Sequence, residues 1–145
     1  MTLGTDGGRG TPVIDIQFDK PGRRYEPGDL LTVQFRIGGV ALDAVSAVET
    51  SVAWYTEGKG EEDLSVHRFE RITNRDALKA ACDGGGFETR LPPSPLTYEG
   101  VIVKIRWCVR VRVFQAGGRD YVSEHVFDVG SLPPARALTT PEGAP

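Results

Sequence analysis

The sequence predicts an all-β protein in which two antiparallel sheets pack face to face, with at most one short helix. Three observations indicate this fold class. The 145 residues include 18 glycines and 10 prolines, which break the chain into short segments. Seven or eight of these segments have the apolar alternation or the β-branched content of strands. The longest of them, VIVKIRWCVRVRV (101–113), has an apolar side chain at every odd number.

The first strands are indicated by alternation between turn signals. VIDIQF is followed by the turn-rich connection PGRRYEPGD, LLTVQFRI ends at two glycines, and AVETSVAWY places two valines and a tryptophan on one face. The predicted strands are therefore Val13–Phe18, Leu30–Ile37 and Ala47–Tyr55.

The middle of the chain holds the remaining elements. TEGKGEED is predicted to be an exposed acidic loop, LSVHRFERI (64–72) a strand, and RDALKAAC (75–82) the one helix, which three glycines end. FETRL is a short strand that leads into LPPSPLTYEG, whose prolines remove ladder donors and direct it across the end or edge of a sheet. DYVSEHVFDV (120–129) is the last strand.

Length and composition predict one domain. The 39% apolar content builds one core, and the ordered β-sandwich is expected over residues 11–132, between a flexible N-terminus (1–10) and a flexible proline-rich tail (133–145). A net charge of −3 argues against nucleic acid as the partner.

Without a secretory or membrane-spanning apolar run, the expected location is the cytoplasm, with Cys82 and Cys108 as reduced thiols.

The alternation in 101–113 predicts a buried odd face and an outward row of four cations. Burying one such apolar side chain is worth roughly 1.5–3 kcal/mol, whereas a surface ion pair contributes at most about 1 kcal/mol, so the apolar face decides the orientation. The basic row, as we call it, is Lys104, Arg106, Arg110 and Arg112.

A hairpin loop at residues 116–118 would pair positions whose numbers sum to 234. This register sets Trp107 against Phe127 and Val113 against Tyr121 on the core side. On the outer side it sets Arg110 opposite Glu124 and Arg106 opposite Asp128, and it leaves Lys104 and Arg112 without an obvious partner. The basic row is then either a solvated face, half neutralised by the hairpin, or a positive strip for an acidic peptide or a phosphate group.

The block GFETRLPPSPLTYEGVIVKIRWCVRVRV (86–113) resembles the arrestin-like fold, and YEPGDLLTVQFRI resembles the Pro-Gly turn and early strand of that family. The matching residues are Phe87, Leu91, Pro92, Pro93, Pro95, Tyr98, Gly100, Ile105, Trp107, Val109 and Val111. The resemblance implies an immunoglobulin-like β-sandwich from a superfamily of adaptors and scaffolds that includes arrestins and bacterial sporulation-control proteins. Members typically carry two such domains, and this chain has room for one. Residues corresponding to the phosphate-sensing lysines of arrestins are not found, so phosphate recognition is not carried over.

Motifs for chemistry are weak. His67 and His125 have no close metal-ligand spacing with each other or with the cysteines, GKG (58–60) is not a phosphate-binding loop, and no G-x-S-x-G elbow occurs. The acidic run does not by itself place two carboxylates across a cleft. We therefore expect no enzyme, no cofactor and no metal.

The sequence predicts a non-catalytic protein–protein interaction module with an unidentified protein partner and no membrane insertion. Its candidate surfaces are the prolines at 92–95, the basic row, and an acidic loop whose charged residues are Glu57, Lys59, Glu61, Glu62 and Asp63, with the loops ranked above the row. A second hypothesis is a subunit of a larger or homo-oligomeric assembly that associates through an edge strand. A third is a hydrolase or sugar-binding β-sandwich.

Overall fold

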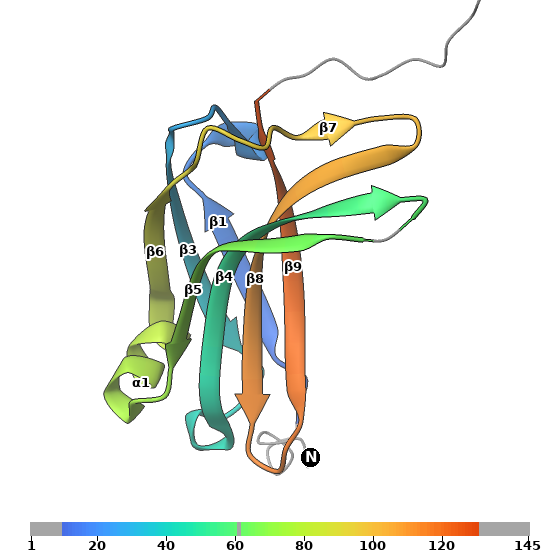
Figure 1. Ribbon diagram of the computed structural model, residues 1–145. Coiled ribbons are helices and arrows are strands. Elements are labelled where there is room, and N and C mark those ends of the chain that lie inside the picture. Colours follow the sequence, from blue (N-terminus) through green and yellow to red (C-terminus); the bar gives the residue numbers. More distant parts are fainter. Residues whose placement is uncertain (1–9, 61, 131–145) are drawn as a thin grey trace, which may run out of the picture.

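The computed structural model describes residues 10–60 and 62–130, which form two sheets packed face to face (Figure 1). The small sheet has the strand order β1 (Val13–Phe18), β3 (Leu30–Gly38), β6 (Gly85–Arg90). The large sheet has the order β2 (Arg24–Tyr25), β9 (Asp120–Val129), β8 (Val103–Gln115), β4 (Val45–Gly58), β5 (Leu64–Ile72), with β7 (Tyr98–Glu99) also paired to β8. Helix α1 (Arg75–Gly84) connects β5 to β6, and 3-10 turns cover Pro21–Arg23 and Leu42–Ala44.

This architecture confirms the predicted all-β sandwich. The described strand pairs are antiparallel with one exception, because the short β2 runs parallel to β9. The predicted limits of β1 and β5 match the structure, whereas β4 extends through Gly58 into the segment that was expected to be loop. The predicted flexible ends fall outside the described residues apart from Gly10, so the domain limits stay predictions.

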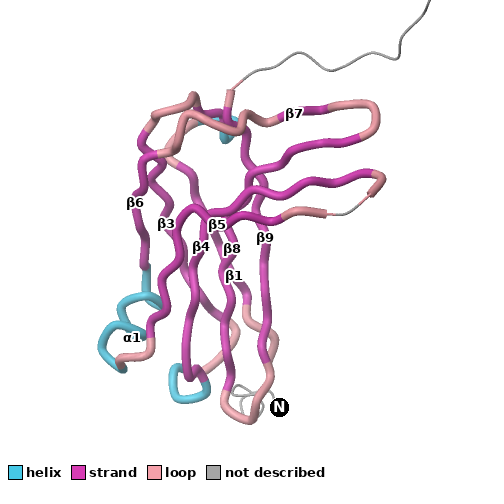
Figure 2. The backbone as a smooth tube through the Cα atoms, viewed as in Figure 1, coloured by secondary structure: helices cyan, strands magenta, loops and turns pink. Residues whose placement is uncertain are grey.

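The inner face of β8 forms the centre of the core. Trp107, Val109, Val111 and Val113 are all 0% exposed, which confirms the predicted inner face for this part of the strand, whereas the even-numbered Cys108, expected on the solvent side, is also 0% exposed. The parity fails nearer the start, where Val101 and Val103 are exposed and Ile105 is only half-buried. The beginning of β8 projects beyond the sandwich together with β7 and the end of β4 (Figure 2), so the second sheet does not cover these side chains.

The β8–β9 hairpin has the predicted register in its central part. Trp107 pairs with Phe127, Arg110 with Glu124 and Val113 with Tyr121. Two details were wrong. Tyr121 is exposed and not part of the core, and the ladder ends at Trp107, so Arg106 does not lie opposite Asp128. Beyond Trp107, β7 replaces β9 beside β8, while Asp128 pairs with Arg24 of β2.

An aromatic cluster joins the two sheets. The ring of Phe127 lies 6.0 Å from that of Trp107, 5.7 Å from Tyr25 and 5.6 Å from Phe18 on the opposite sheet, measured between centroids. The polar atoms at its margin are satisfied, since Trp107 Nε1 donates to the carbonyl of Pro95 (2.9 Å) and the Tyr25 hydroxyl donates to Asp19 Oδ1 (2.6 Å). Burial and the bond to Asp19 raise the pKa of Tyr25, which keeps this hydroxyl a donor.

Helix α1 begins at the predicted residue, Arg75, and extends through Gly84, two residues beyond the predicted end at Cys82. The Asn74 side chain accepts a hydrogen bond from Ala77 N at the N-terminus, and Leu78 and Ala81 are its buried residues. A side chain at Gly85 would collide with Phe35 and Ala81, so the glycine run both ends α1 and lets β6 approach β3 closely. Cys82 and Cys108 are both free thiols, as predicted.

Replacing Trp107 by alanine is expected to lower the free energy of unfolding by about 3–5 kcal/mol, because the change empties a fully buried site at the join between the sheets. Urea denaturation followed by circular dichroism measures the loss. The comparison is Arg110→Gln on the same strand, which breaks an ion pair with a partly exposed carboxylate and is expected to cost about 1 kcal/mol or less. Equal losses in the two variants would contradict the assignment of the inner and outer faces.

Candidate interaction surface

Two hairpin ends lie side by side and project from the sandwich (Figure 1). We call this part the arm: the end of β4 (55–58), the start of β5 (64–66), β7, the start of β8 (103–106) and the two turns between them. The start of β8 pairs with β4 on one side, where Lys104 lies opposite Glu57, and with β7 on the other side, where Lys104 lies opposite Glu99. The arm is therefore a continuation of the large sheet that carries no opposing sheet.

Ion pairs hold the strands of the arm together. Arg106 Nε lies 2.5 Å from Glu57 Oε1, Lys104 Nζ lies 3.1 Å from Glu99 Oε2, and Arg106 Nη2 lies 3.6 Å from the same Glu99 oxygen. The hydrogen bond to Glu57 raises the pKa of Arg106. These side chains are partly exposed, so each pair contributes at most about 1 kcal/mol, and their network mainly fixes how the strands lie.

Three aliphatic residues form the tip of the arm. The exposed fraction is 62% for Val101, 67% for Ile102 and 37% for Val103. Such residues are normally placed in a core, and three in a row at the end of a projecting hairpin form an apolar patch that faces solvent. We call Val101–Val103 the aliphatic tip.

The aliphatic tip is fastened to the neighbouring turn. Lys59 N donates to the carbonyl of Ile102 over 3.4 Å, and within the tip hairpin Gly100 N donates to the carbonyl of Val103. Gly58 has a φ of +144°, and a Cβ there would collide with the Ile102 carbonyl oxygen. Glycine is thus required where the two turns meet, and a shallow open hollow remains between them.

The predicted acidic loop is divided between a strand and a turn. Glu57 is part of β4 and is ion-paired, whereas Lys59, Glu62 and Asp63 lie exposed in or next to the turn. The backbone of Asp63 closes the hairpin through bonds to Thr56. Glu61 lies outside the described residues. Of the described residues of this turn, Lys59 is the one that bonds the aliphatic tip, at the carbonyl of Ile102.

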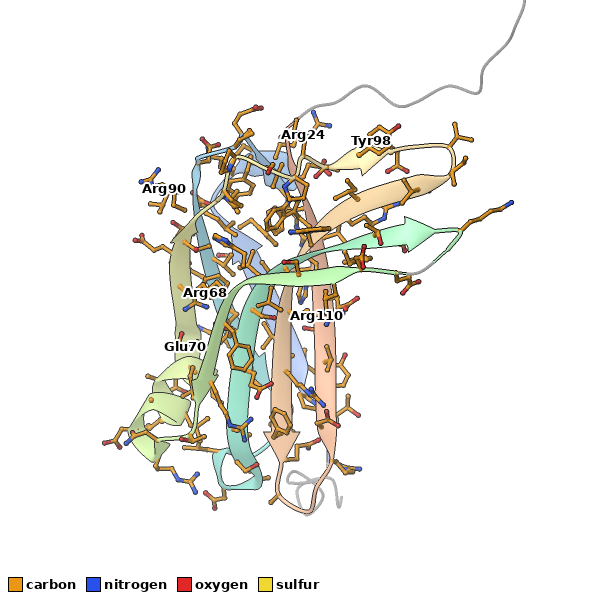
Figure 3. All side chains as sticks on the ribbon, viewed as in Figure 1. Arg24, Arg68, Glu70, Arg90, Tyr98 and Arg110 are labelled. Carbon is orange, nitrogen blue, oxygen red and sulfur yellow. The ribbon has the colours of Figure 1, made fainter. Side chains whose placement is uncertain are left out.

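The basic row extends from the arm onto the outer face of the large sheet, where Figure 3 labels Arg110. Arg110 pairs with Glu124 and Arg112 with Asp120, both at 2.5 Å, and Arg112 also stacks on Phe114. The expectation that Lys104 and Arg112 lack partners was wrong, because β7 supplies Glu99 and the start of β9 supplies Asp120. Each of the four cations of the basic row therefore forms an ion pair with a carboxylate. A positive strip for an acidic ligand stays a prediction that this pairing does not favour.

Sequence reasoning missed the aliphatic tip because it assigned Val101 and Val103 to the core by their odd numbers. A signal was available in Ile102, which follows Val101 directly. Two neighbouring residues of a strand point to opposite faces, so a second sheet on one side covers only one of them directly.

The contacts of the two histidines and of Cys108 are those of residues that support the fold. His67 Nε2 lies 2.9 Å from the carbonyl oxygen of Arg90, and the rings of His67 and Trp107 are steeply inclined with centroids 6.1 Å apart. His125 Nε2 lies 2.8 Å from Ser123 Oγ on the same strand, and burial lowers the pKa of His125. Burial raises the pKa of Cys108 to about 11, which keeps it a thiol. Within residues 10–60 and 62–130, no three His, Cys, Asp or Glu side chains gather as a metal site.

The comparisons with known proteins address the fold. No protein-family model matches the chain. The crystal structure of Spo0M, a sporulation control protein from Bacillus subtilis, is similar with a TM-score of 0.55 over 85% of this chain and 51% of that chain, at 14% sequence identity. The fold is therefore arrestin-like. The ribosome maturation factor RimM of Kocuria rhizophila is 32% identical over 80 residues, which are 52% of this chain and 42% of that protein.

The chain spans about half the length of Spo0M and less than half of RimM. In the part of the chain that the structure describes, no helix has the length and apolar character needed to cross a membrane.

Stability is expected to fall as the pH is lowered through the range of an ordinary histidine, in part because of His125. Its pKa in the folded protein is depressed by burial and by nearby Arg23, so below about pH 6.5 the unfolded chain binds a proton that the folded chain resists. The contribution is present above that pH and lost below it. Urea denaturation at pH 7.5 and 5.5 should show a smaller pH effect in His125→Gln than in wild type. An unchanged pH effect would contradict the assignment.

Proposed function

We propose that this protein is a non-catalytic protein-binding module that engages its partner through the aliphatic tip of the arm. The observation that carries the proposal is the exposure of Val101 and Ile102 at 62% and 67% on a hairpin that ion pairs and a glycine contact hold in place. Burying each of these side chains in a partner pocket would contribute roughly 1.5–3 kcal/mol. A turn that is already fixed loses little conformational entropy on binding, so more of this free energy is available as affinity.

The charges around the aliphatic tip define the partner it would fit. Glu62 and Asp63 are exposed in the turn of the neighbouring hairpin and make no ion pair with another described residue, whereas Glu57 and Glu99 are already paired. An apolar pocket with a cationic rim would match this surface, because the rim cations would meet the two free carboxylates. Lys59 and Lys104 offset part of the negative charge of the arm, so the attraction to a cationic rim would come mainly from Glu62 and Asp63.

The fold supports this proposal at a coarser level. An arrestin-like sandwich places the hairpin ends away from the core, so the arm can vary without disturbing the buried face of β8. The similarity to Spo0M is one of fold, and the control of sporulation named in its title is a property of that protein.

The similarity to RimM adds no ribosomal role to the proposal. It covers 42% of that protein, so the activity of the whole factor does not transfer. An RNA surface would also need unneutralised cations, whereas carboxylates accompany the basic row and the net charge of the chain is −3.

The double change Val101→Ser with Ile102→Ser is expected to reduce recovery of the partner at least tenfold, because it removes the apolar contact and leaves the ion pairs in place. The measurement is affinity purification from the native cell followed by quantitative mass spectrometry. Once a partner is identified, titration calorimetry gives the ratio of the two dissociation constants.

The matched control is Val122→Ser with Val126→Ser. These two valines are 43% and 39% exposed on β9, so the control removes a smaller exposed apolar area by the same kind of change, away from the arm. It should bind like wild type. Equal recovery with the tip variant and the control, whether both retain or both lose the partner, would refute the tip as the binding site.

A further inference from the structure

The strands at the ends of the two sheets are β1 and β6 in the small sheet and β2 and β5 in the large sheet. Because β2 pairs with only the last two residues of β9, residues 120–127 of β9 are a further edge, on which the carbonyl of Val126 accepts a hydrogen bond from Arg23. On β5, Val52 pairs with Arg68 and Ala53 with Val66, so His67 is the extra residue of a β-bulge. Arg68 and Glu70 form an ion pair on this edge strand (Figure 3). Bulges and charges of this kind hinder the addition of another strand. β2 has only two residues, and on β6 the carbonyl of Arg90 is occupied by His67.

β1 is the outer strand of the small sheet, and it has no bulge and a single charged residue, Asp15. It presents six residues, Val13–Phe18, without a bulge, a lysine or a proline inside the strand. Val13 is 57% exposed, and Ile14, Ile16 and Phe18 are only partly buried at the margin of the core. A straight edge with half-covered apolar side chains is suited to pair with another strand.

The hydrogen-bond phase of β1 shows which backbone groups are free to pair. Asp19 N donates to the carbonyl of Thr32, and antiparallel ladders alternate between bonded and non-bonded residues. Odd-numbered residues of β1 therefore direct their backbone groups to β3. The N–H and C=O groups of Ile14, Ile16 and Phe18 point away from the sheet.

The sequence of β1 is complementary to itself in one antiparallel register. If Ile16 lies opposite Ile16 of a second copy, Ile14 lies opposite Phe18 on the core side and Asp15 lies opposite Gln17 on the outer side. Moving the register by two residues places Asp15 against either Asp15 or Asp19 of the other copy, and like charges directly opposite are unfavourable. Moving it by one residue opposes apolar and polar side chains.

We propose that a second copy of this chain pairs through β1, antiparallel and centred on Ile16, and so joins two three-stranded small sheets into one continuous sheet. The three outward-facing residues of each copy exchange backbone hydrogen bonds across a two-fold axis. Apolar side chains at the core margin gain the partner's apolar side chains as neighbours. This inference is independent of the proposed function, because the arm is part of the large sheet.

Position 17 provides a test in both directions. Gln17→Asp places a carboxylate opposite Asp15 twice per dimer, and Gln17→Lys places an ammonium group there twice. Sedimentation equilibrium at low ionic strength should show a dimer whose dissociation constant rises about threefold to tenfold in Gln17→Asp and falls by a similar factor in Gln17→Lys. The control is Gln34→Asp on β3, which lies beside Gln17 and away from the edge, and it should leave the dissociation constant unchanged.

Ile16→Pro tests the central pair. It removes a donor that β3 does not use, so circular dichroism should show a folded chain while sedimentation shows a monomer. A wild type that stays monomeric up to millimolar concentration would overturn the proposal, as would a dimer that responds equally to the changes at positions 17 and 34. The tip variant Val101→Ser with Ile102→Ser should dimerise like wild type, so failure of the tip as a binding site and failure of β1 as a dimer edge give different results.

Discussion

The burial of one face of β8 is the constraint on which the rest of this structure depends. From Trp107 to Val113 the odd residues are 0% exposed, and they are enclosed because the small sheet packs over them. Their burial orients the strand, and the orientation in turn places a half-buried Arg110 and an exposed Arg112 on the outer face. The neighbouring strands supply carboxylates at matching positions, so the outer face is nearly neutral along the basic row. A charged row of this kind is a consequence of packing on the other face.

In the arm, β8 keeps its alternation of apolar and charged residues, but no second sheet packs on its apolar face. Where β8 continues towards its start, Ile105 and Val103 become progressively more exposed, and the arm is held by cross-strand ion pairs in place of a core. Ion pairs at a surface are weak individually. They suffice here because β8 is bonded on both sides, to β4 and to β7, so the backbone ladder carries the strand out of the sandwich.

Edges and tips are separate features of this fold. The β-bulge at His67 and the ion pair between Arg68 and Glu70 blunt β5, and His67 also reaches across to β6 beside the Trp107 ring. The large sheet is thereby closed to further pairing along this edge, while the small sheet keeps β1 open. Apolar surface that remains exposed is concentrated at the aliphatic tip and on the outer faces of β5 and β9.

The sequence by itself determined the fold class, the limits of β1 and β5, and the central register of the β8–β9 hairpin, because these depend on local alternation and on the few residues of a turn. It also determined the inner face of β8 from Trp107 onward, since apolar burial outweighs the pairing of surface charges. Only the tertiary structure decided where the second sheet ends. That limit exposes Val101 and Val103, pairs Arg106 with Glu57 in place of Asp128, and leaves Tyr121 outside the core. A two-residue period is the same in a covered strand and in a projecting one, so the alternation could not reveal which segment the other sheet would cover.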